Sequence, residues 1–447
     1  MVAHLLVSSS IVAAVPVGHG DHSVTPGNPG HPRGRSGKLA DMDHTISGTH
    51  LLDPAVIDEP YAFYDDLRAN APVWEVPGTG IFTVATFELT AEAAGRVEDF
   101  SSNLHCLLYR DAHGMPCRLP FGHAGVQALA TADPPMHAMH RDSVFPELVA
   151  KRMAALEPDI VEIAEDCVAE ALNGGSVDFM AVIGNVVPIT MISRLVGFHD
   201  SDLDQLLNAA FDSTAMLGST LSYDDLVAHI TRTVEIAEWV SRQLSAAMGE
   251  PTHDLLGVVA QGVTSESLSE DEAVVILHTL LSAGGESTTS LLGNAVRILA
   301  EHRDLQSELR TNPALIPMFV EEALRLEPPF RYHMRSVSHD TALGGVEIPA
   351  GATLLLLWGS ANRDPEVFEH PDAIDLNRKV LRRHVAFGRG IHHCVGAPLA
   401  RVEARNVLSV LLARTSAITL DPDYPPTWAN SLMVRRHEEL PVQLVAS

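Results

Sequence analysis

The stretch Phe387-Gly-Arg-Gly-Ile-His-His-Cys-Val-Gly396 places one cysteine, Cys394, in a loop that is hinged by glycines. Apolar residues recur at helical spacing after this loop, from Leu399 to Leu411, with charged residues between them. This pattern predicts a helix that begins just after the sulfur. Because the N-terminal end of a helix carries unpaired N–H groups and partial positive charge, such a helix would favour a thiolate at Cys394.

A thiolate in this setting is a candidate ligand of haem iron, to which it donates electron density in a way that promotes O–O cleavage. The glycines would let the backbone turn sharply and approach a flat macrocycle. Zinc is the alternative for a His-His-Cys sequence, but a zinc site needs further ligands at short spacing. The other cysteines, Cys106, Cys117 and Cys167, stand alone in the sequence, which favours haem.

Every fixed position of the loop matches the haem loop of the cytochrome P450 superfamily, Phe-Gly-x-Gly-x-His-x-Cys-x-Gly, which this chain therefore resembles. The resemblance implies that heme b (iron protoporphyrin IX) is bound with Cys394 as the metal ligand. It also implies that Phe387 packs beside the sulfur, that Gly388 and Gly396 belong to the cofactor site, and that His392 reaches a haem propionate.

A long helix with an unusual centre is the second strong signal. Ser269 and Glu272 form a capping-box pattern, and the apolar residues that follow predict about 32 residues, or roughly 48 Å, of helix. Its centre, Ala283-Gly-Gly-Glu-Ser-Thr-Thr-Ser290, is rich in glycine and hydroxyl residues, each of which costs up to about 1 kcal/mol relative to alanine. Such residues leave room for a ligand against the backbone, or they allow two helices to pack closely.

This centre resembles the oxygen-binding groove of the same family, Ala-Gly-x-Glu/Asp-Thr. The resemblance places Ala283 and Gly284 against the cofactor. It implies that Glu286 is the acid and Ser287 the alcohol of a pair that delivers protons for dioxygen activation. The family usually has threonine where this chain has Ser287, which leaves open whether Thr288 shares the role.

Haem propionates are anions and need donors. The segment that begins at Asp133 resembles the family's Asp-Pro-Pro-x-His-x-x-x-Arg helix and implies propionate binding by His137 and Arg141. Arg335 matches a further arginine with that role. Each of these residues, taken singly, could equally be a solvated side chain.

The same family also has a buried Glu-x-x-Arg pair that is tied to a later arginine. Glu322 and Arg325 lie three residues apart on one predicted helix face, and Arg378 stands at the matching later position. An ordinary surface ion pair is the alternative. The resemblance implies a structural network that positions the cysteine loop.

The order of patterns predicts a mainly α fold with small β-sheets. A helix at residues 60–68 precedes a hairpin of Val73–Val76 and Ile81–Val84, helices fill about 136–326, and short strands return near 341–348 and 353–357. This order resembles the whole P450 fold, which implies a single large domain over residues 51–447 with haem between the long helix and the cysteine loop. Residues 1–50, rich in glycine and proline, are expected to form a disordered extension. A weak signal peptide or a translation start at Met42 is the alternative.

Composition restricts the partners and the compartment. Thirty basic residues against 57 acidic ones give a formal net charge of −27, which argues against nucleic acid or an anionic membrane as a partner. The sequence has no stretch of about 18 apolar residues that could cross a bilayer. Four cysteines without a pairing pattern fit a reducing compartment, so we expect a cytoplasmic protein.

The resemblance implies a haem-thiolate monooxygenase that inserts one atom of dioxygen into a small hydrophobic molecule. Electrons would come from NAD(P)H through a separate ferredoxin and ferredoxin reductase, because the chain contains no flavin or iron–sulfur segment. A peroxide-driven peroxygenase and a non-catalytic haem protein that senses or carries a ligand remain open as alternatives.

Two further sets of residues are expected around the site. Candidate cations for docking an acidic ferredoxin are Arg141, Lys151, Arg152, Arg389, Arg401 and Arg405. Candidate substrate contacts, for which core packing is the alternative, are residues 104–126, Met216, Leu217, Leu280, Leu281, Phe330–His333, Leu432 and Met433.

Overall fold

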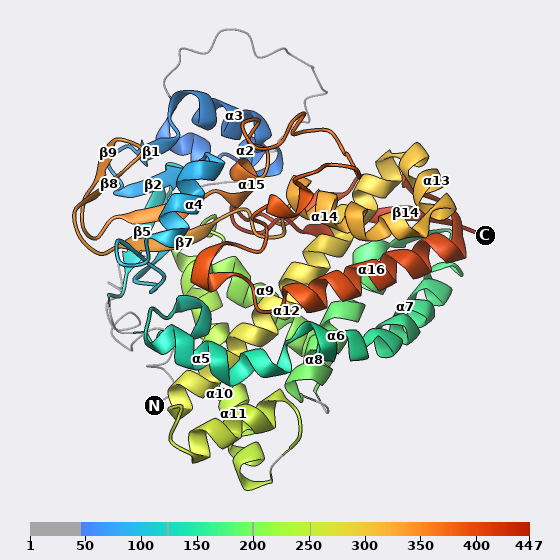
Figure 1. Ribbon diagram of the computed structural model, residues 1–447, viewed down its shortest axis with the longest axis horizontal. Helices are drawn as coiled ribbons and strands as arrows, with labels where there is room; N and C mark the ends of the chain where they lie inside the picture. Colours follow the sequence, from blue (N-terminus) through green and yellow to red (C-terminus); the bar gives the residue numbers. More distant parts are fainter. Residues whose placement is uncertain (1–45, 123–124, 199–200, 251) are drawn as a thin grey trace, which may run out of the picture.

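The computed structural model describes residues 46–122, 125–198, 201–250 and 252–447 (Figure 1). Helices form most of this part of the chain, so the predicted mainly α fold with small β-sheets is confirmed. The α-helices are α2 (Pro54–Asp58), α3 (Tyr61–Asn70), α4 (Phe87–Gly95), α5 (Met136–Val144), α6 (Ala150–Ala155), α7 (Glu157–Ala171), α8 (Val186–Val196), α9 (Leu203–Met216), α10 (Tyr223–Gly249), α11 (Leu255–Thr264), α12 (Glu270–Glu301), α13 (Arg303–Thr311), α14 (Ile316–Leu326), α15 (Trp358–Ala361) and α16 (Ala397–Arg414). Shorter helical turns are η2 (Gly48–Leu52), η3 (Leu129–Thr131), η4 (Phe145–Glu147), η5 (Met180–Gly184), η6 (Pro313–Leu315), η7 (Leu381–Arg383) and η8 (Gly390–His392).

The strands form several small sheets. They are β1 (Val73–Val76), β2 (Ile81–Val84), β3 (Phe100–Ser101), β4 (Cys106–Arg110), β5 (Pro116–Pro120), β6 (Ser176–Asp178), β7 (His333–Val337), β8 (Thr341–Leu343), β9 (Val346–Ile348), β10 (Thr353–Leu356), β11 (Thr415–Leu420), β12 (Thr427–Trp428), β13 (His437–Glu439) and β14 (Pro441–Ala446). The largest sheet has the order β1-β2-β10-β7-β3, and its β1–β2 pair is the predicted hairpin.

Strand β7 brings two polar side chains to one face of this sheet. It pairs antiparallel with β10, so that His333 lies opposite Leu356 and Arg335 lies opposite Leu354. Because side chains alternate between the two faces of a strand, His333 and Arg335 project from the same face.

Helix α12 passes through the middle of the molecule (Figure 1). Its predicted capping box is present, since Ser269 Oγ accepts from the Glu272 N–H (3.2 Å) and the Glu272 carboxylate accepts from the Ser269 N–H (2.8 Å). Helices α8, α9, α10 and α16 pack around α12. Most of its residues are buried, so its side chains face neighbouring elements or an interior cavity.

The predicted Glu322 network is confirmed and is fully buried. Arg325 donates to the Glu322 carboxylate through Nε at 3.0 Å and Nη2 at 2.7 Å, and Arg378 Nε donates to Glu322 Oε1 at 2.8 Å. Arg325 also donates to the carbonyl oxygens of Pro371 and Ala373. These bonds fix the segment that precedes the cysteine loop.

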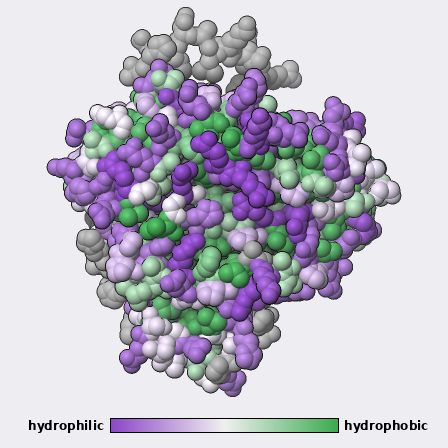
Figure 2. Space-filling view, viewed as in Figure 1, coloured by the Kyte–Doolittle hydropathy of each residue, from purple (hydrophilic) through white to green (hydrophobic). Residues whose placement is uncertain are grey.

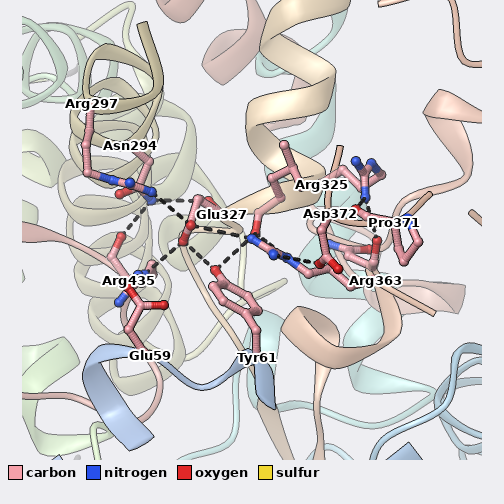
Figure 3. Close-up of polar contacts among 12 residues, drawn as sticks. Glu59, Tyr61, Asn294, Arg297, Arg325, Glu327, Arg363, Pro371, Asp372 and Arg435 are labelled. Atoms are coloured by element: carbon pink, nitrogen blue, oxygen red, sulfur yellow. Dashed lines mark hydrogen bonds and ion pairs between the residues drawn. The ribbon is translucent and has the colours of Figure 1, made fainter. Parts of the chain in front are cut away.

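A second buried carboxylate, Glu327, has no counterpart among the sequence-based predictions. Arg435 Nε and Arg297 Nη2 each lie 2.9 Å from one of its oxygens, and the Tyr61 hydroxyl donates to Oε2 at 2.5 Å (Figure 3). Arg363 joins the cluster at 3.5 Å. Burial alone would raise the pKa of the Glu327 carboxyl, but Arg435, Arg297 and Arg363 hold that pKa at about 2. The cluster ties α3, α12 and the end of α14 to the segment around Arg435.

The described part of the chain includes residues before the expected domain boundary at residue 51. Residues Gly48–Leu52 form η2, which Ser47 caps, and Leu51 and Leu52 are completely buried. Burial of these leucines holds the turn against the domain. Residues 1–45, for which the extension was expected, lie outside the described residues. Across the described ranges, no helix combines the length and the apolar character needed to cross a membrane.

Candidate active site

A cavity lies between α12 and the cysteine loop. It has an empty volume of about 1420 Å³, counting the part that opens to solvent. Its walls come from α5, α8, α12, β7, the start of α15 and the loop that leads into α16. All of the predicted site residues except Glu286 line it, namely His137, Arg141, Ala283, Gly284, Ser287, Thr288, Arg335, Phe387, Gly388, His392, Cys394 and Gly396.

The loop around Cys394 depends on two glycines. Gly388 and Gly390 have φ angles of 68° and 76°, in the left-handed region. A Cβ on Gly390 would also lie only 2.9 Å from the carbonyl oxygen of Ala94. The Cys394 N–H donates to the Phe387 carbonyl at 2.9 Å, and α16 begins three residues after the cysteine, as the sequence predicts. The thiol faces the cavity.

The expected preference for a thiolate is not a property of the protein alone. Burial raises the pKa of the Cys394 thiol, while the N–H groups of Gly396 and Ala397 and the guanidinium groups of Arg141 and Arg401 lower it. The net direction is upward, because loss of hydration outweighs the helix terminus that the sequence reveals. A metal ion removes the proton of a coordinating thiol outright, so the raised pKa does not oppose a ligand role.

Side chains behind the loop hold it in place. The Arg401 guanidinium lies 4.4 Å from the centre of the Phe387 ring, and its Nε lies 2.6 Å from Glu321 Oε1. From α5, Arg141 donates to the His393 carbonyl oxygen at 2.9 Å. These contacts orient the aromatic ring and the cysteine before any ligand binds.

Basic side chains gather at one part of the cavity wall. The rings of His137 and His392 lie 4.1 Å apart, and Arg141 and Arg335 line the same cavity. Burial lowers the pKa of Arg335 to about 10, although the Asp133 carboxylate opposes the shift. Burial, with Arg335, His137 and Arg141, lowers the pKa of His392 to about 3, and His392 Nε2 is buried without a hydrogen-bond partner among the described residues. The buried Arg335 cation, the Arg141 guanidinium and the orphaned ring nitrogen of His392 can bind an anion, so the cluster fits the two carboxylates of haem.

Ser287 and Thr288 are held in different ways. Ser287 Oγ donates to the carbonyl oxygen of Ala283, one turn earlier, at 2.6 Å. Thr288 is hydrogen-bonded to Glu403 of α16, whose pKa is raised well above its usual range by burial. Burial therefore favours the protonated form of Glu403. Both residues line the cavity, but the Thr288 hydroxyl is bound to a neighbouring helix.

Glu286 is the one predicted site residue that does not line the cavity. Arg436 Nε lies 2.8 Å from Glu286 Oε1, and the Thr214 hydroxyl donates to Oε2 at 3.0 Å. Burial raises the pKa of the Glu286 carboxyl, against Arg436, Thr214 and Ser290, which lower it. Its carboxylate can act on the cavity only by releasing these partners or through water.

The glycines of α12 also serve helix packing. A Cβ on Gly284 would lie 2.7 Å from Ile192 Cδ1 of α8, and one on Gly285 would lie 3.1 Å from Ala210 Cβ of α9. Gly284 lines the cavity as well. Close packing through small residues, the alternative explanation of this sequence, therefore accompanies the ligand site.

The expected substrate contacts are only partly right. Leu280, Phe330 and His333 line the cavity. The described residues within 104–126 do not, because they form the β4–β5 hairpin, which packs on Leu226 and Ile230 of α10. Buried apolar clusters, not the cavity wall, contain the remaining candidates Met216, Leu217, Leu281, Leu432 and Met433.

Several wall residues were missed from the sequence. Ile192 and Leu195 of α8 and Trp358 at the start of α15 line the cavity. The apolar spacing of α8 signals burial but not what it is buried against, and no motif marks Trp358. Only the pairing of β10 with β7 would have placed Trp358 beside His333.

The zinc alternative gains no support. Within the ranges that the structure describes, no three His, Cys, Asp or Glu side chains come together as a metal-binding group.

Known proteins resemble this chain over most of its length. The family model described as Cytochrome P450 matches residues 233–440. Cytochrome P450 144 of Mycobacterium tuberculosis (strain CDC 1551 / Oshkosh) is 38% identical over 92% of this chain and 98% of its own. The mycinamicin IV hydroxylase/epoxidase of Micromonospora griseorubida is 35% identical over 70% of this chain and 79% of its own. The crystal structure of CYP109E1 from Bacillus megaterium in complex with testosterone is 27% identical, covers 88% of this chain and 99% of its own, and superposes with a TM-score of 0.78.

Proposed function

The chain belongs to the cytochrome P450 family and is a haem-binding monooxygenase, and we propose that it oxidises a small hydrophobic molecule with electrons from a ferredoxin and its reductase. One atom of dioxygen enters the substrate and the other leaves as water, with NAD(P)H as the source of two electrons. The proposal includes neither nucleic acid nor a membrane as partner. All four cysteines are free thiols, which supports a reducing, cytoplasmic location.

The observation that carries the proposal is that Cys394 lines one cavity together with the Ser287 and Thr288 hydroxyl groups of α12. When bound by Cys394, haem supplies an iron centre that activates dioxygen. Phe387, Gly388 and Gly396 would lie beside the thiolate, Ala283 and Gly284 on the α12 side. The haem carboxylates would bind the basic cluster of His137, Arg141, Arg335 and His392.

Proton delivery is assigned to Glu286 and Ser287. Ser287 is preferred over Thr288 because its hydroxyl makes a local bond to a main-chain carbonyl, whereas Thr288 is bound to Glu403. Burial favours the protonated form of Glu286, which lies behind the cavity wall beside Arg436. A water molecule between Glu286 and Ser287 would complete the path.

The cavity wall supports a hydrophobic substrate. It includes the apolar side chains of Leu129, Leu148, Ile192, Leu195, Leu280, Leu291, Leu324 and Phe330. Apolar walls bind ligands by removing apolar surface from water. Testosterone, which a structural neighbour binds, is a suitable first compound for a ligand screen.

A cationic area near the cysteine loop supports a ferredoxin partner. Figure 2 shows strongly hydrophilic residues across the middle of the face that carries α5 and α16. Arg383 and Arg389 are exposed, and their guanidinium groups lie 5.6 and 5.8 Å from the centre of the Phe87 ring. Three of the expected cations are instead partly neutralised, since Arg152, Arg401 and Arg405 pair with Glu147, Glu321 and Glu157. An acidic protein would be attracted to the exposed guanidinium groups of Arg383 and Arg389.

Spectroscopy and turnover test the proposal together. The reduced protein under carbon monoxide should show the strongly red-shifted Soret band of a thiolate-ligated haem, and Cys394→Ser should lose it. Ligands found by the spectral shift should then yield product with NAD(P)H, ferredoxin and reductase. Product from hydrogen peroxide alone would favour the peroxygenase, and ligand binding without coupled consumption of NAD(P)H and dioxygen would favour a sensor or carrier.

A further inference from the structure

His333 and Trp358 form a hydrogen-bonded pair in the cavity wall. The indole Nε1 of Trp358 lies 2.7 Å from His333 Nδ1. Strand pairing brings them together, because His333 begins β7 opposite Leu356 of β10, and Trp358 follows β10 by two residues. Both side chains line the cavity. Trp358 is also packed in the apolar core beside the five-stranded sheet, so its ring is held firmly.

This pairing determines which nitrogen of His333 carries the proton. An indole N–H only donates, so Nδ1 of His333 must accept. Burial, together with Arg335, lowers the pKa of His333 to about 4, so the ring is neutral at physiological pH. The single proton of a neutral imidazole then sits on Nε2. No described residue accepts a hydrogen bond from Nε2, and Nε2 is not completely buried by protein atoms.

The surroundings of His333 differ along the strand. Arg335, on the same face, belongs to the basic cluster that fits the haem carboxylates. On the other side, the Phe330 ring stands edge-on to the imidazole with centres 5.7 Å apart and belongs to the apolar wall. His333 therefore offers a directed, uncharged donor at the junction between the basic cluster and the apolar wall.

We propose that the Nε2–H of His333 is a fixed hydrogen-bond donor for an acceptor oxygen inside the cavity, and that Trp358 is the residue that positions it. This rests on the proposed function. The acceptor is either a haem carboxylate or a carbonyl or hydroxyl oxygen of the substrate. In the second case the enzyme selects hydrophobic molecules that carry such an oxygen.

The tautomer can be read directly by ¹⁵N NMR of histidine-labelled protein in the diamagnetic, ferrous carbon monoxide form. His333→Gln identifies the signals of this ring. The wild type should carry the proton on Nε2, whereas Trp358→Phe should show a mixture of tautomers. A proton on Nδ1 in the wild type would overturn the proposal. The same signals can be recorded in haem-free protein, so a failure of haem binding would count against the proposed function alone.

Two measurements on His333→Phe identify the acceptor. If it is a haem carboxylate, loss of the donor leaves the negative charge of that carboxylate less compensated, and the reduction potential of the ligand-free protein falls. If it is a substrate oxygen, the potential is unchanged and an acceptor-bearing ligand binds about 3- to 10-fold more weakly, the range of one neutral hydrogen bond.

The probes for the second measurement are 1-(4-acetylphenyl)imidazole and 1-(4-ethylphenyl)imidazole. Both anchor on the iron through the imidazole nitrogen, and only the first carries a carbonyl group. Their dissociation constants come from the Soret shift. His278→Gln is the control, because His278 is a buried neutral imidazole that bonds Ser213 and does not line the cavity. If His333→Phe changes neither the potential nor the ratio of the two constants relative to this control, the proposal is wrong.

Discussion

Arg436 holds the carboxylate of Glu286 from behind, with its Nε 2.8 Å from Oε1 and its guanidinium 3.9 Å from the centre of the Phe211 ring. The carboxylate is almost completely buried, and Arg436 supplies the positive charge that balances it. Glu286 lies in the centre of α12, whose cavity face carries Ser287. The acid proposed for proton delivery is thus controlled by a residue that follows it by 150 positions in the chain.

Replacement of this arginine should change the pH dependence of turnover. In Arg436→Gln the pKa of Glu286, already raised by burial, should rise further, because Arg436 is the largest influence that lowers it. The limb of the pH–rate profile that reports Glu286 should move to higher pH, with haem content unchanged. Arg232→Gln removes an exposed cation of the Asp212 pair and should leave the profile in place. Glu286→Gln should slow turnover by about 10²–10⁴-fold. Identical profiles in wild type and Arg436→Gln would contradict the assignment.

Ser287→Ala should uncouple the reaction. Electrons should pass to hydrogen peroxide while haem content and ligand affinity stay close to those of the wild type. The measurement is product formed and peroxide released per NAD(P)H consumed. Thr288→Ala should affect coupling less, but should lower stability by about 1–3 kcal/mol because the buried Glu403 carboxyl loses its partner. If coupling were lost in Thr288→Ala and not in Ser287→Ala, the proton-delivery role would belong to Thr288.

The Glu327 cluster predicts a defined acid sensitivity. Its pKa is about 2 in the folded protein, below the ordinary value of 4.5. A lowered pKa stabilises the fold above pH 4.5, and this stabilisation, about 3 kcal/mol, should disappear as the pH falls from 4.5 to 2. Denaturant unfolding of Glu327→Gln should lack this component of the pH dependence.

At neutral pH the same variant should be less stable by about 3–5 kcal/mol, since Arg435, Arg297 and Arg363 would keep buried charges without the carboxylate. Glu301→Gln is the matched control, because it removes a more exposed partner of Arg297. It should cost at most about 1 kcal/mol. Equal losses of stability in the two variants would show that the buried cluster contributes no more than a more exposed ion pair.

Electron transfer should depend on the cations beside Phe87. In Arg383→Glu combined with Arg389→Glu, the rate of reduction by an acidic ferredoxin should fall about tenfold or more at low salt, and the difference should shrink as salt is added. Stopped-flow reduction under carbon monoxide measures it. Arg242→Glu combined with Arg303→Glu, which makes the same charge change at exposed positions of α10 and α13, is the control. An equal effect of the control would mean that net charge, not a docking site, governs the rate.

The features predicted correctly from the sequence are those contained in single segments. The cysteine loop with its helix, the capped α12 and the β1–β2 hairpin each follow from neighbouring residues. The Glu327 cluster could not be predicted, because Tyr61, Arg297 and Arg435 are ordinary residues far apart in the chain.

Burial, which a local pattern does not reveal, affects two of the predicted features. At Cys394 the N–H groups of the helix terminus lower the thiol pKa, as the sequence predicts, but burial raises it. Residues 104–126 matched a region that lines pockets, but alternating apolar residues there pair as β4 and β5 and bury Leu107 against α10. In both cases the long-range environment, not the local residue pattern, decides the outcome.

The dependence of Glu286 on Arg436 and of Glu327 on Arg435 sets an order of events during synthesis. At about 5–20 residues per second, Arg436 is made roughly 8 to 30 s after Glu286, from which it is separated by 150 residues. Until then the Glu286 carboxyl, in the centre of α12, lacks its cation, so we expect the packing of α12 to remain incomplete while the nascent chain grows. Haem would enter late, although Cys394 has already been translated. A nonsense mutation between Cys394 and Arg435 would yield a polypeptide that contains the iron ligand but cannot retain the cofactor.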